Sequence, residues 1–426
     1  MYCGNCFRDN ALVAALRRAG HDVAMIPLYL PLTLDEEDQS ADTPIFFGGI
    51  SVYLEQKSAL FRHAPRWLHR MLASRRMLAW AGKRAAKTRP DDVGDLMLSM
   101  LRGEAGRQAS ELETLIVWLK NHAQADVICL SNALLVGMAR RLKAEMATPI
   151  VCFLQGEDYF LDSLPDKYRE AAWHLLRERA ADVDLFIAPT RYFADLMMRR
   201  LNLSVEKVRV VFNGIELDGY AAENSHQRAT QKAAPVLGYF ARMCKEKGLD
   251  TVVEAYIHIK NRENVPRLKL HIGGSCGPGD EPFVKELRKR LAAAGYIGEV
   301  NFSPNLSRGE KIDFLSALTV FSVPASYGEA FGLYLIEAMA AGVPVVQPRT
   351  ASFTELVEAT SGGVLCEPGN AKVLGEAIEK LVLDAKQLQT LGETGRKTVF
   401  ERFNADVMAE ETIKLIATLA ARTLSQ

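Results

Sequence analysis

Short apolar segments alternate along the chain with longer stretches in which apolar residues recur at helical spacing. In the first half, this pattern predicts a helix at 9–19 and strands at 21–27, 126–130, 149–154, 184–188 and 208–212. In the second half, it predicts strands at 236–240, 269–272, 300–302, 319–323 and 343–347. Because regular alternation of strands and helices is typical of α/β folds with parallel sheets, we predict that fold class.

A polar run at 221–234 separates the two series and has no apolar periodicity. We therefore predict a first domain at 1–220, a linker at 221–234, a second domain at 235–400 and a terminal segment at 401–426, with a helix at 405–424. The chain has 426 residues, enough for two domains that each bury a core.

Composition narrows the classes of protein to consider. Apolar residues make up 48% of the chain, and its formal net charge is zero, so we expect no nucleic-acid partner. No apolar run reaches about 18 residues and no signal-peptide pattern opens the chain, so we expect a cytoplasmic protein. The seven cysteines are scattered, and Cys3 and Cys6 have no second pair beside them, so we expect neither a disulfide framework nor a metal site.

Two carboxylates in the segment 327–346 carry the strongest chemical signal. Glu329 and Glu337 lie eight positions apart around a predicted helix start. At about 1.5 Å per helical residue, we expect the two carboxylates to lie about 12 Å apart along the axis, with the N–H groups of the first turn between them. This layout suits a nucleotide sugar, in which a diphosphate lies between two hydroxyl-rich groups.

The same segment resembles the Glu-x7-Glu motif of retaining glycosyltransferases of the family 4 type, which have two facing Rossmann-like domains in the GT-B fold. The resemblance covers most of the chain and implies a C-terminal domain that binds a nucleotide sugar, an N-terminal domain on the acceptor side and a last helix that crosses back. It implies that Glu337 accepts from ribose hydroxyls and that Glu329 holds the transferred sugar. It also implies that the backbone N–H groups of Phe331, Gly332 and Leu333 face the donor. The alternative is an ordinary amphipathic helix with solvated glutamates.

Residues 238–248 resemble the Gly-Arg…Lys-Gly signature of the same family and contain Arg242 and Lys247. Cleavage of a sugar–diphosphate bond builds negative charge that fixed cations can neutralise. Arginine offers a planar fork and lysine a point charge, so we predict catalytic roles for both and neither a metal nor a cofactor. The alternative is two solvated basic residues. Gly273, in the glycine-rich stretch 272–279, either lines the nucleotide pocket or only forms a turn.

In the first half, residues 149–158 resemble a family strand whose end usually carries a histidine, and Gln155 occupies that position. Its amide can donate to a sugar oxygen but cannot titrate near neutral pH. Glu157 and Asp158 are the nearest carboxylates and are predicted on the acceptor side.

Gly4 corresponds to the second glycine of a family loop that approaches the donor phosphates, whereas Cys3 replaces the first glycine. That loop normally follows a central first strand, which this chain apparently lacks. We expect the natural start to lie about 10–15 residues upstream, because losing a central strand leaves ladder groups unpaired. A stop codon directly before Met1 would refute this expectation.

The segment 56–90 contains ten basic residues and no acidic residue, with apolar residues at helical spacing. A basic amphipathic helix is attracted to anionic membrane surfaces, and a helix with a core-facing apolar side is the alternative.

These observations predict a retaining, metal-independent enzyme that moves a hexose-type sugar from a nucleoside diphosphate to a hydroxyl of a glycan or lipid-linked acceptor. A nucleotide-sugar 2-epimerase of the same fold and a catalytically degenerate binding protein remain alternatives. A dinucleotide oxidoreductase is disfavoured, because no Gly-x-Gly-x-x-Gly opens a helix after a strand.

Overall fold

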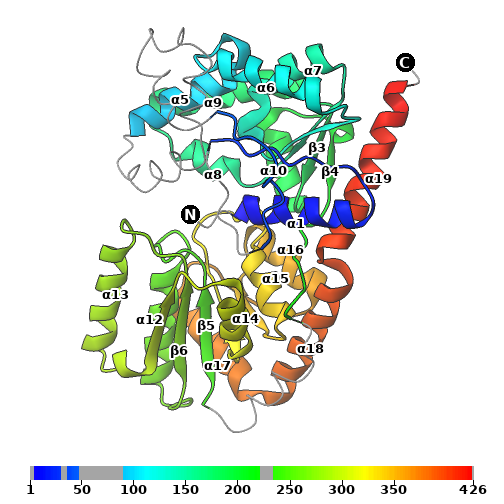
Figure 1. Cartoon of the computed structure of the whole chain (residues 1–426). Coiled ribbons are helices and arrows are strands. Elements are labelled where there is room, and N and C mark those ends of the chain that lie inside the picture. Colours follow the sequence, from blue (N-terminus) through cyan, green and yellow to red (C-terminus); the bar gives the residue numbers. More distant parts are fainter. Residues whose placement is uncertain (1–3, 30–35, 48–89, 221–233, 425–426) are drawn as a thin grey trace. The chain divides into compact units, whose positions relative to one another are not determined.

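A computed structural model describes residues 4–29, 36–47, 90–220 and 234–424 (Figure 1). The chain divides into two compact units, one formed by residues 213–407 and the other by residues 3–212 together with 408–426. Most of the linker predicted at 221–234 lies outside the described residues, and so does the basic segment predicted at 56–90 except for its last residue.

The unit of residues 3–212 contains a parallel sheet in the order β1-β2-β3-β4. Its strands are β1 (Ile128–Leu130), β2 (Ile150–Phe153), β3 (Leu185–Ala188) and β4 (Val208–Val210). Every residue of β2 and β3 is buried, as expected for strands covered on both faces. The helices of this unit are α1 (Gly4–Arg18), α5 (Pro90–Arg102), α6 (Ala109–His122), α7 (Ala139–Met146), α8 (Glu157–Asp162), α9 (Asp166–Arg179) and α10 (Arg191–Leu201), with short 3-10 turns such as η3 (Ala133–Met138).

The strand predicted at 21–27 is wrong. Its neighbour Leu28 makes only an isolated bridge to Phe46, with Tyr29 N–H donating to the Phe46 carbonyl at 2.9 Å. A strand exists only where a neighbouring strand supplies a ladder, and local apolar pattern does not supply that partner. Among the strands that the structure describes, β1 lies at the sheet edge, and the expectation of a further central strand stays a prediction.

The unit of residues 213–407 contains a six-stranded parallel sheet in the order β10-β9-β8-β5-β6-β7. Its strands are β5 (Val236–Phe240), β6 (Lys269–Gly274), β7 (Val300–Pro304), β8 (Val320–Phe321), β9 (Val345–Pro348) and β10 (Gly363–Cys366). The chain runs outward from β5 to β7 and then crosses to β8 on the other side of β5. This is the doubly wound order, in which the point where the direction reverses is the usual ligand site.

Helices cover both faces of this sheet (Figure 1). They are α12 (Leu249–Asn261), α13 (Glu281–Ala293), α14 (Arg308–Ser316), α15 (Leu333–Ala340), α16 (Ala351–Thr360), α17 (Ala371–Leu383) and α18 (Ala385–Arg402). The final helix, α19 (Ala405–Leu424), begins and ends as predicted, and the grouping of residues changes from one unit to the other within it, after Val407. The predicted α/β class with parallel sheets is confirmed.

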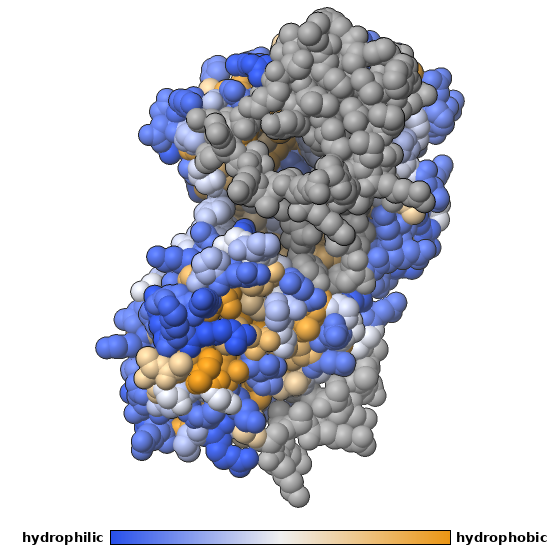
Figure 2. All heavy atoms as spheres, turned by 60° about the vertical axis from the view of Figure 1, so that its left-hand side comes forward, coloured by the Kyte–Doolittle hydropathy of each residue, from blue (hydrophilic) through white to orange (hydrophobic). Residues whose placement is uncertain are grey.

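On the face that Figure 2 shows, the described residues present mainly hydrophilic side chains, with smaller hydrophobic areas among them. Within the described ranges, no helix combines the length and apolarity needed to cross a membrane. The same ranges hold no group of three or more His, Cys, Asp or Glu side chains placed to bind a metal ion.

Candidate functional site

Three loops in the unit of residues 213–407 carry most of the predicted site. They follow β5, β6 and β8, and the carboxyl ends of adjacent parallel strands lie at one edge of a sheet. Gly248, with a φ of +73°, packs so tightly that a Cβ there would lie 2.1 Å from the Pro324 carbonyl oxygen. Ser326 N–H also donates to the Glu246 carbonyl at 2.9 Å. These contacts hold the loop before α12 against the loop after β8.

Lys247 and Glu329 meet across these two loops. Lys247 Nζ lies 2.5 Å from Glu329 Oε2, and their side chains are 21% and 15% exposed. The hydroxyls of Tyr327 and Tyr334 donate to the same carboxylate oxygen at 3.1 and 2.9 Å. The ammonium group also lies 5.0 and 5.3 Å from the centroids of these two rings. The structure thus brings together two residues that are separated by 82 positions.

The environment of Glu329 keeps its carboxylate charged. Burial pushes the pKa of Glu329 upward, but the Lys247 charge and the hydrogen bonds from Lys247, Tyr334 and Tyr327 outweigh it, so the pKa lies below its usual value. Burial and the adjacent Glu329 charge raise the pKa of Tyr334 well above its usual value. At neutral pH, Tyr334 is therefore a hydrogen-bond donor and Glu329 an acceptor.

Arg242, in the loop after β5, pairs with a carboxylate that sequence reasoning missed. Its Nη2 and Nε donate to Asp280 Oδ1 at 2.8 and 3.1 Å. Asp280 is buried at the start of α13 and also accepts from Gly277 N–H at 3.0 Å. Asp280 therefore orients the guanidinium while 62% of the Arg242 side chain stays exposed. An aspartate just before a helix signals an N-cap position, but nothing in the pattern indicates the arginine contact.

Gly273 lies near the end of β6, where a Cβ would come within 2.6 Å of the Phe240 ring. The loop that follows is held by Asn305, whose side chain accepts from Cys276 N–H and donates to its carbonyl, both at 3.1 Å. These contacts explain the glycine structurally, and contact of Gly273 with a nucleotide stays a prediction.

Glu337 lies within α15 and pairs with a second residue that the sequence did not indicate. Lys311 Nζ, on α14, lies 2.8 Å from Glu337 Oε1, and the two side chains are 9% and 18% exposed. Because α15 begins at Leu333, Glu329 lies in the preceding loop, and the predicted 12 Å helical separation is wrong.

The start of α15 shows why the helix does not extend back to Glu329. Gly332 precedes the helix with a φ of +96°, which ends the preceding loop in the left-handed region. Phe331 is buried, and its carbonyl accepts from Ser352 Oγ at 2.9 Å. The predicted donors Phe331, Gly332 and Leu333 therefore lie on a firmly packed turn that leads into a helix N-terminus.

The predicted residues of the first half belong to the other unit. Gln155 follows β2, and its backbone N–H donates to Glu157 Oε2 at 2.8 Å. The other oxygen of Glu157 accepts from Ala133 N–H at 2.7 Å. Glu157 is only 4% exposed, and burial raises its pKa. It therefore ties together the loops after β1 and β2, a role that sequence reasoning missed; an acceptor-side role stays a prediction.

Asp158 and Gly4 complete the set. Asp158 is partly buried, its Oδ1 has no hydrogen-bond partner among the described residues, and burial raises its pKa. Gly4 is the first residue of α1. This helix lies beside the carboxyl end of the sheet, because the Arg8 guanidinium is 4.0 Å from the Phe153 ring centroid and donates to the Ser131 carbonyl at 3.3 Å. Contact of Gly4 or Asp158 with a substrate stays a prediction.

Comparison with protein families matches both halves of the chain. The model for glycosyl transferases group 1 matches residues 221–398, and the model for glycosyltransferase family 4 matches residues 94–218. One similar curated protein is D-inositol 3-phosphate glycosyltransferase from Streptomyces bingchenggensis, 29% identical over 55% of this chain and 52% of that protein. Another is the capsular polysaccharide biosynthesis glycosyltransferase CapM from Staphylococcus aureus, 28% identical over 47% of this chain and 50% of that protein. The chain thus spans about half the length of these curated relatives.

Solved structures share the fold. HepE from Anabaena, crystallised with UDP, matches with a TM-score of 0.63 and 19% identity over 74% of this chain and 83% of that chain. Sucrose-phosphate synthase from Thermosynechococcus elongatus matches with a TM-score of 0.70 and 20% identity over 96% and 92% of the two chains.

Proposed function

Because this chain belongs to the group 1 and family 4 type of glycosyltransferases and has the GT-B fold, we propose that it transfers a hexose-type sugar from a nucleoside diphosphate to a hydroxyl acceptor. The reaction proceeds with retention of configuration and without a metal ion. The observation that carries this proposal is the Lys247–Glu329 pair at the switch point of the second sheet, beside the Arg242 loop.

The donor diphosphate takes the place of Glu329 beside Lys247 and binds Arg242 alongside Asp280. Lys247 leaves Glu329 for a phosphate oxygen, while Arg242, held by Asp280, directs its exposed edge to the diphosphate. Negative charge grows on this group as the sugar bond breaks, and cations positioned in advance stabilise that charge without further reorganisation. Glu329 then accepts hydrogen bonds from hydroxyls of the sugar, and Glu337 from those of the ribose.

Retention follows when the acceptor attacks the face that the diphosphate leaves. A phosphate oxygen takes the acceptor's proton, the new glycosidic bond forms and the sugar–phosphate bond breaks. Gln155 donates to a sugar oxygen and needs no titration for this step. No protein nucleophile is required.

Names of similar proteins support the donor and acceptor classes. HepE structures hold UDP or UDP-glucose, and CapM is named for capsular polysaccharide biosynthesis. Another relative is named a phosphatidylinositol monomannoside mannosyltransferase. We infer a nucleoside diphosphate sugar as donor, and a glycan or lipid-linked acceptor of the cell envelope. The segment 56–90 is the candidate contact with an anionic membrane, in a cytoplasmic protein.

Calorimetric titration with UDP, GDP and ADP tests the donor site directly. We expect one of the three to bind and its affinity to fall at least about tenfold in Lys247→Ala, because a charge-assisted hydrogen bond is lost. Unchanged affinity in both Lys247→Ala and Arg242→Ala would contradict the site. Formation of an epimer from the nucleotide sugar alone would instead favour the epimerase reading.

A further inference from the structure

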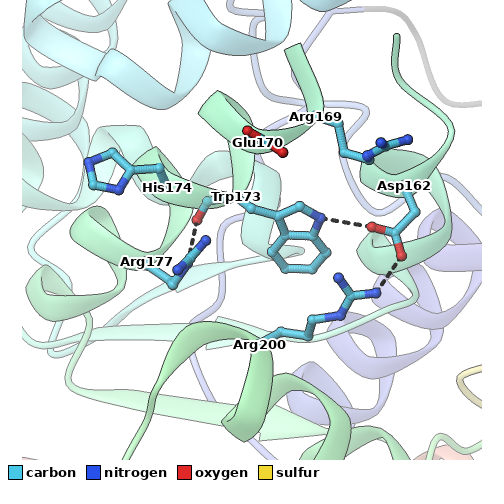
Figure 3. Close-up of a pocket in the computed structure, with 7 residues that line it drawn as sticks. All are labelled: Asp162, Arg169, Glu170, Trp173, His174, Arg177 and Arg200. Carbon is cyan, nitrogen blue, oxygen red and sulfur yellow. Dashed lines mark hydrogen bonds and ion pairs between the residues drawn. The ribbon is translucent and has the colours of Figure 1, made fainter. Parts of the chain in front are cut away.

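A pocket of about 510 Å³ lies among α8, α9 and α10 in the unit of residues 3–212 (Figure 3). Its volume falls in the range of small-molecule sites, which is about 300–1,000 Å³. The side chains that line it are polar or aromatic: Asp162, Arg169, Glu170, Trp173, His174, Arg177 and Arg200.

Side chains that contact one another form one wall of this pocket. Asp162 accepts from Trp173 Nε1 at 2.9 Å and from Arg200 Nη2 at 2.5 Å. The Arg200 guanidinium carbon lies 4.8 Å from the indole centroid, so the cation is stacked near the ring as well as paired (Figure 3). These contacts hold the Trp173 indole and the Arg200 side chain in place, and Arg200 neutralises the charge of Asp162.

The other two arginines are more available to a ligand. Arg177 is exposed and donates through Nε to the Trp173 carbonyl at 3.2 Å. Arg169 pairs with Asp166, whose side chain is 89% exposed, and such solvated pairs contribute little. With Asp162 neutralised by Arg200, two arginines oppose the single carboxylate of Glu170.

The pocket adjoins the predicted acceptor side. α8 begins at Glu157, two residues after Gln155, and ends at Asp162. Asp158 and Asp162 are four residues apart on this helix, so they lie about one turn from each other on the same side. The buried Oδ1 of Asp158 also accepts no hydrogen bond from any described residue.

We propose that this pocket binds the phosphate or carboxylate of an anionic sugar or polyol acceptor. That the ligand is an acceptor rests on the proposed transferase function, whereas its binding to the pocket does not. Guanidinium groups recognise phosphate and carboxylate oxygens with paired hydrogen bonds. Glu170 can accept from a hydroxyl but would repel a polyanion, so a ligand with one anionic group and several hydroxyls fits better than a polyphosphate or a nucleic acid.

Calorimetry on the full chain at low salt tests binding, with glucose 6-phosphate as probe and glucose as its neutral match. We expect glucose 6-phosphate to bind at least about tenfold more tightly than glucose. The double variant Arg169→Gln/Arg177→Gln should lose about tenfold or more in affinity for the phosphate. Lys167→Gln removes an exposed charge from the same helix outside the pocket and should stay within about twofold of the wild type.

Equal binding of glucose and glucose 6-phosphate would overturn the proposal, as would a double variant that folds, by circular dichroism, and binds like the wild type. Vesicles of phosphatidylcholine with and without phosphatidylinositol distinguish the source of the anionic group. Binding that requires phosphatidylinositol and is lost in the double variant identifies a lipid headgroup, whereas binding of the soluble phosphate alone identifies a free saccharide. A parallel titration with nucleoside diphosphates separates the two proposals, because its failure alone would remove the transferase and leave the pocket.

Discussion

The carboxyl ends of the two parallel sheets carry charged groups in opposite situations. In the unit of residues 213–407, Lys247, Arg242 and Lys311 each face a carboxylate within 2.8 Å, and the Arg242 side chain is largely exposed. In the unit of residues 3–212, both carboxylate oxygens of Glu157 accept hydrogen bonds from backbone N–H groups. The buried Oδ1 of Asp158 has no partner among the residues that the structure describes.

Arg8 deepens this contrast. Its side chain is 1% exposed, and its Nε and Nη1 have no partner in the described part of the chain, although its Nη2 lies 3.0 Å from Asp9. Burial raises the pKa of Asp9 to about 6 despite the adjacent arginine. One sheet edge therefore holds paired charges that a ligand can exchange, whereas the other holds charges fixed in the packing.

Lys247→Ala should have the largest effect on catalysis. We expect kcat/KM to fall by about 100- to 1,000-fold, because a cation placed on developing charge is removed. Lys245→Ala is the matched control, since Lys245 is exposed two residues earlier, and it should leave the rate within about twofold. Steady-state kinetics with a nucleotide-sugar donor measures both variants. Equal values of kcat/KM for the two would contradict a catalytic role for Lys247.

Glu157→Gln should be the largest change in stability at the other edge. Ala133 N–H and Gln155 N–H bond to different oxygens of the carboxylate, and in glutamine an NH2 group replaces one of them. Because one N–H then loses its acceptor, we expect the free energy of unfolding to fall by about 1–3 kcal/mol. Asp158→Asn should cost less, because no protein hydrogen bond to its Oδ1 is lost. Urea denaturation measures both free energies of unfolding. An unchanged value for Glu157→Gln would mean that the contacts of Glu157 with the two loops do not stabilise the fold.

Asp280→Asn should have a smaller effect on catalysis than Lys247→Ala. The arginine remains but loses its charged support, so we expect kcat/KM to fall about tenfold. Glu281→Gln, at the adjacent exposed position, serves as the control. If the rate rose instead, Asp280 would be a competitor for Arg242 and not its support.

The two edges should respond to pH with opposite signs. The pKa of Glu329 is lowered on folding, so its ionised form stabilises the fold above the ordinary glutamate range, and this contribution is lost as pH falls. The pKa of Glu157 is raised, so its ionisation costs stability, and this cost grows as pH rises above the ordinary glutamate pKa and is complete above the folded value. Unfolding free energies of Glu329→Gln, Glu157→Gln and wild type should show the small opposite slopes, that of Glu329 below the ordinary glutamate pKa and that of Glu157 above it, over a range from about pH 3 to pH 8. Parallel curves would contradict the assignment.

Sequence patterns predicted most strands because a fully buried parallel strand has a local apolar signature. β5 begins and ends as predicted, and β6 to β9 lie within two residues of prediction at each end. β10 was not predicted, and none of its residues is fully buried. The failure at 21–27 is of another kind, because pairing depends on a distant partner. Likewise, Lys247 and Glu329 were each identified, but their contact depends on the adjacency of β5 and β8, which no local pattern contains.

The residues that sequence reasoning missed share a cause. They are charged side chains that are buried: Asp280, Lys311 and Glu157. From sequence alone, a charged residue is expected at the surface. Each is buried because it has a partner brought near by tertiary packing.

A crystal structure of the chain with bound UDP or GDP tests the exchange of charges at the second sheet most directly. The account predicts diphosphate oxygens about 3 Å from Lys247 Nζ, with Lys247 turned away from Glu329 and the diphosphate at the start of α15. A nucleotide bound elsewhere, with the Lys247–Glu329 pair intact, would contradict it.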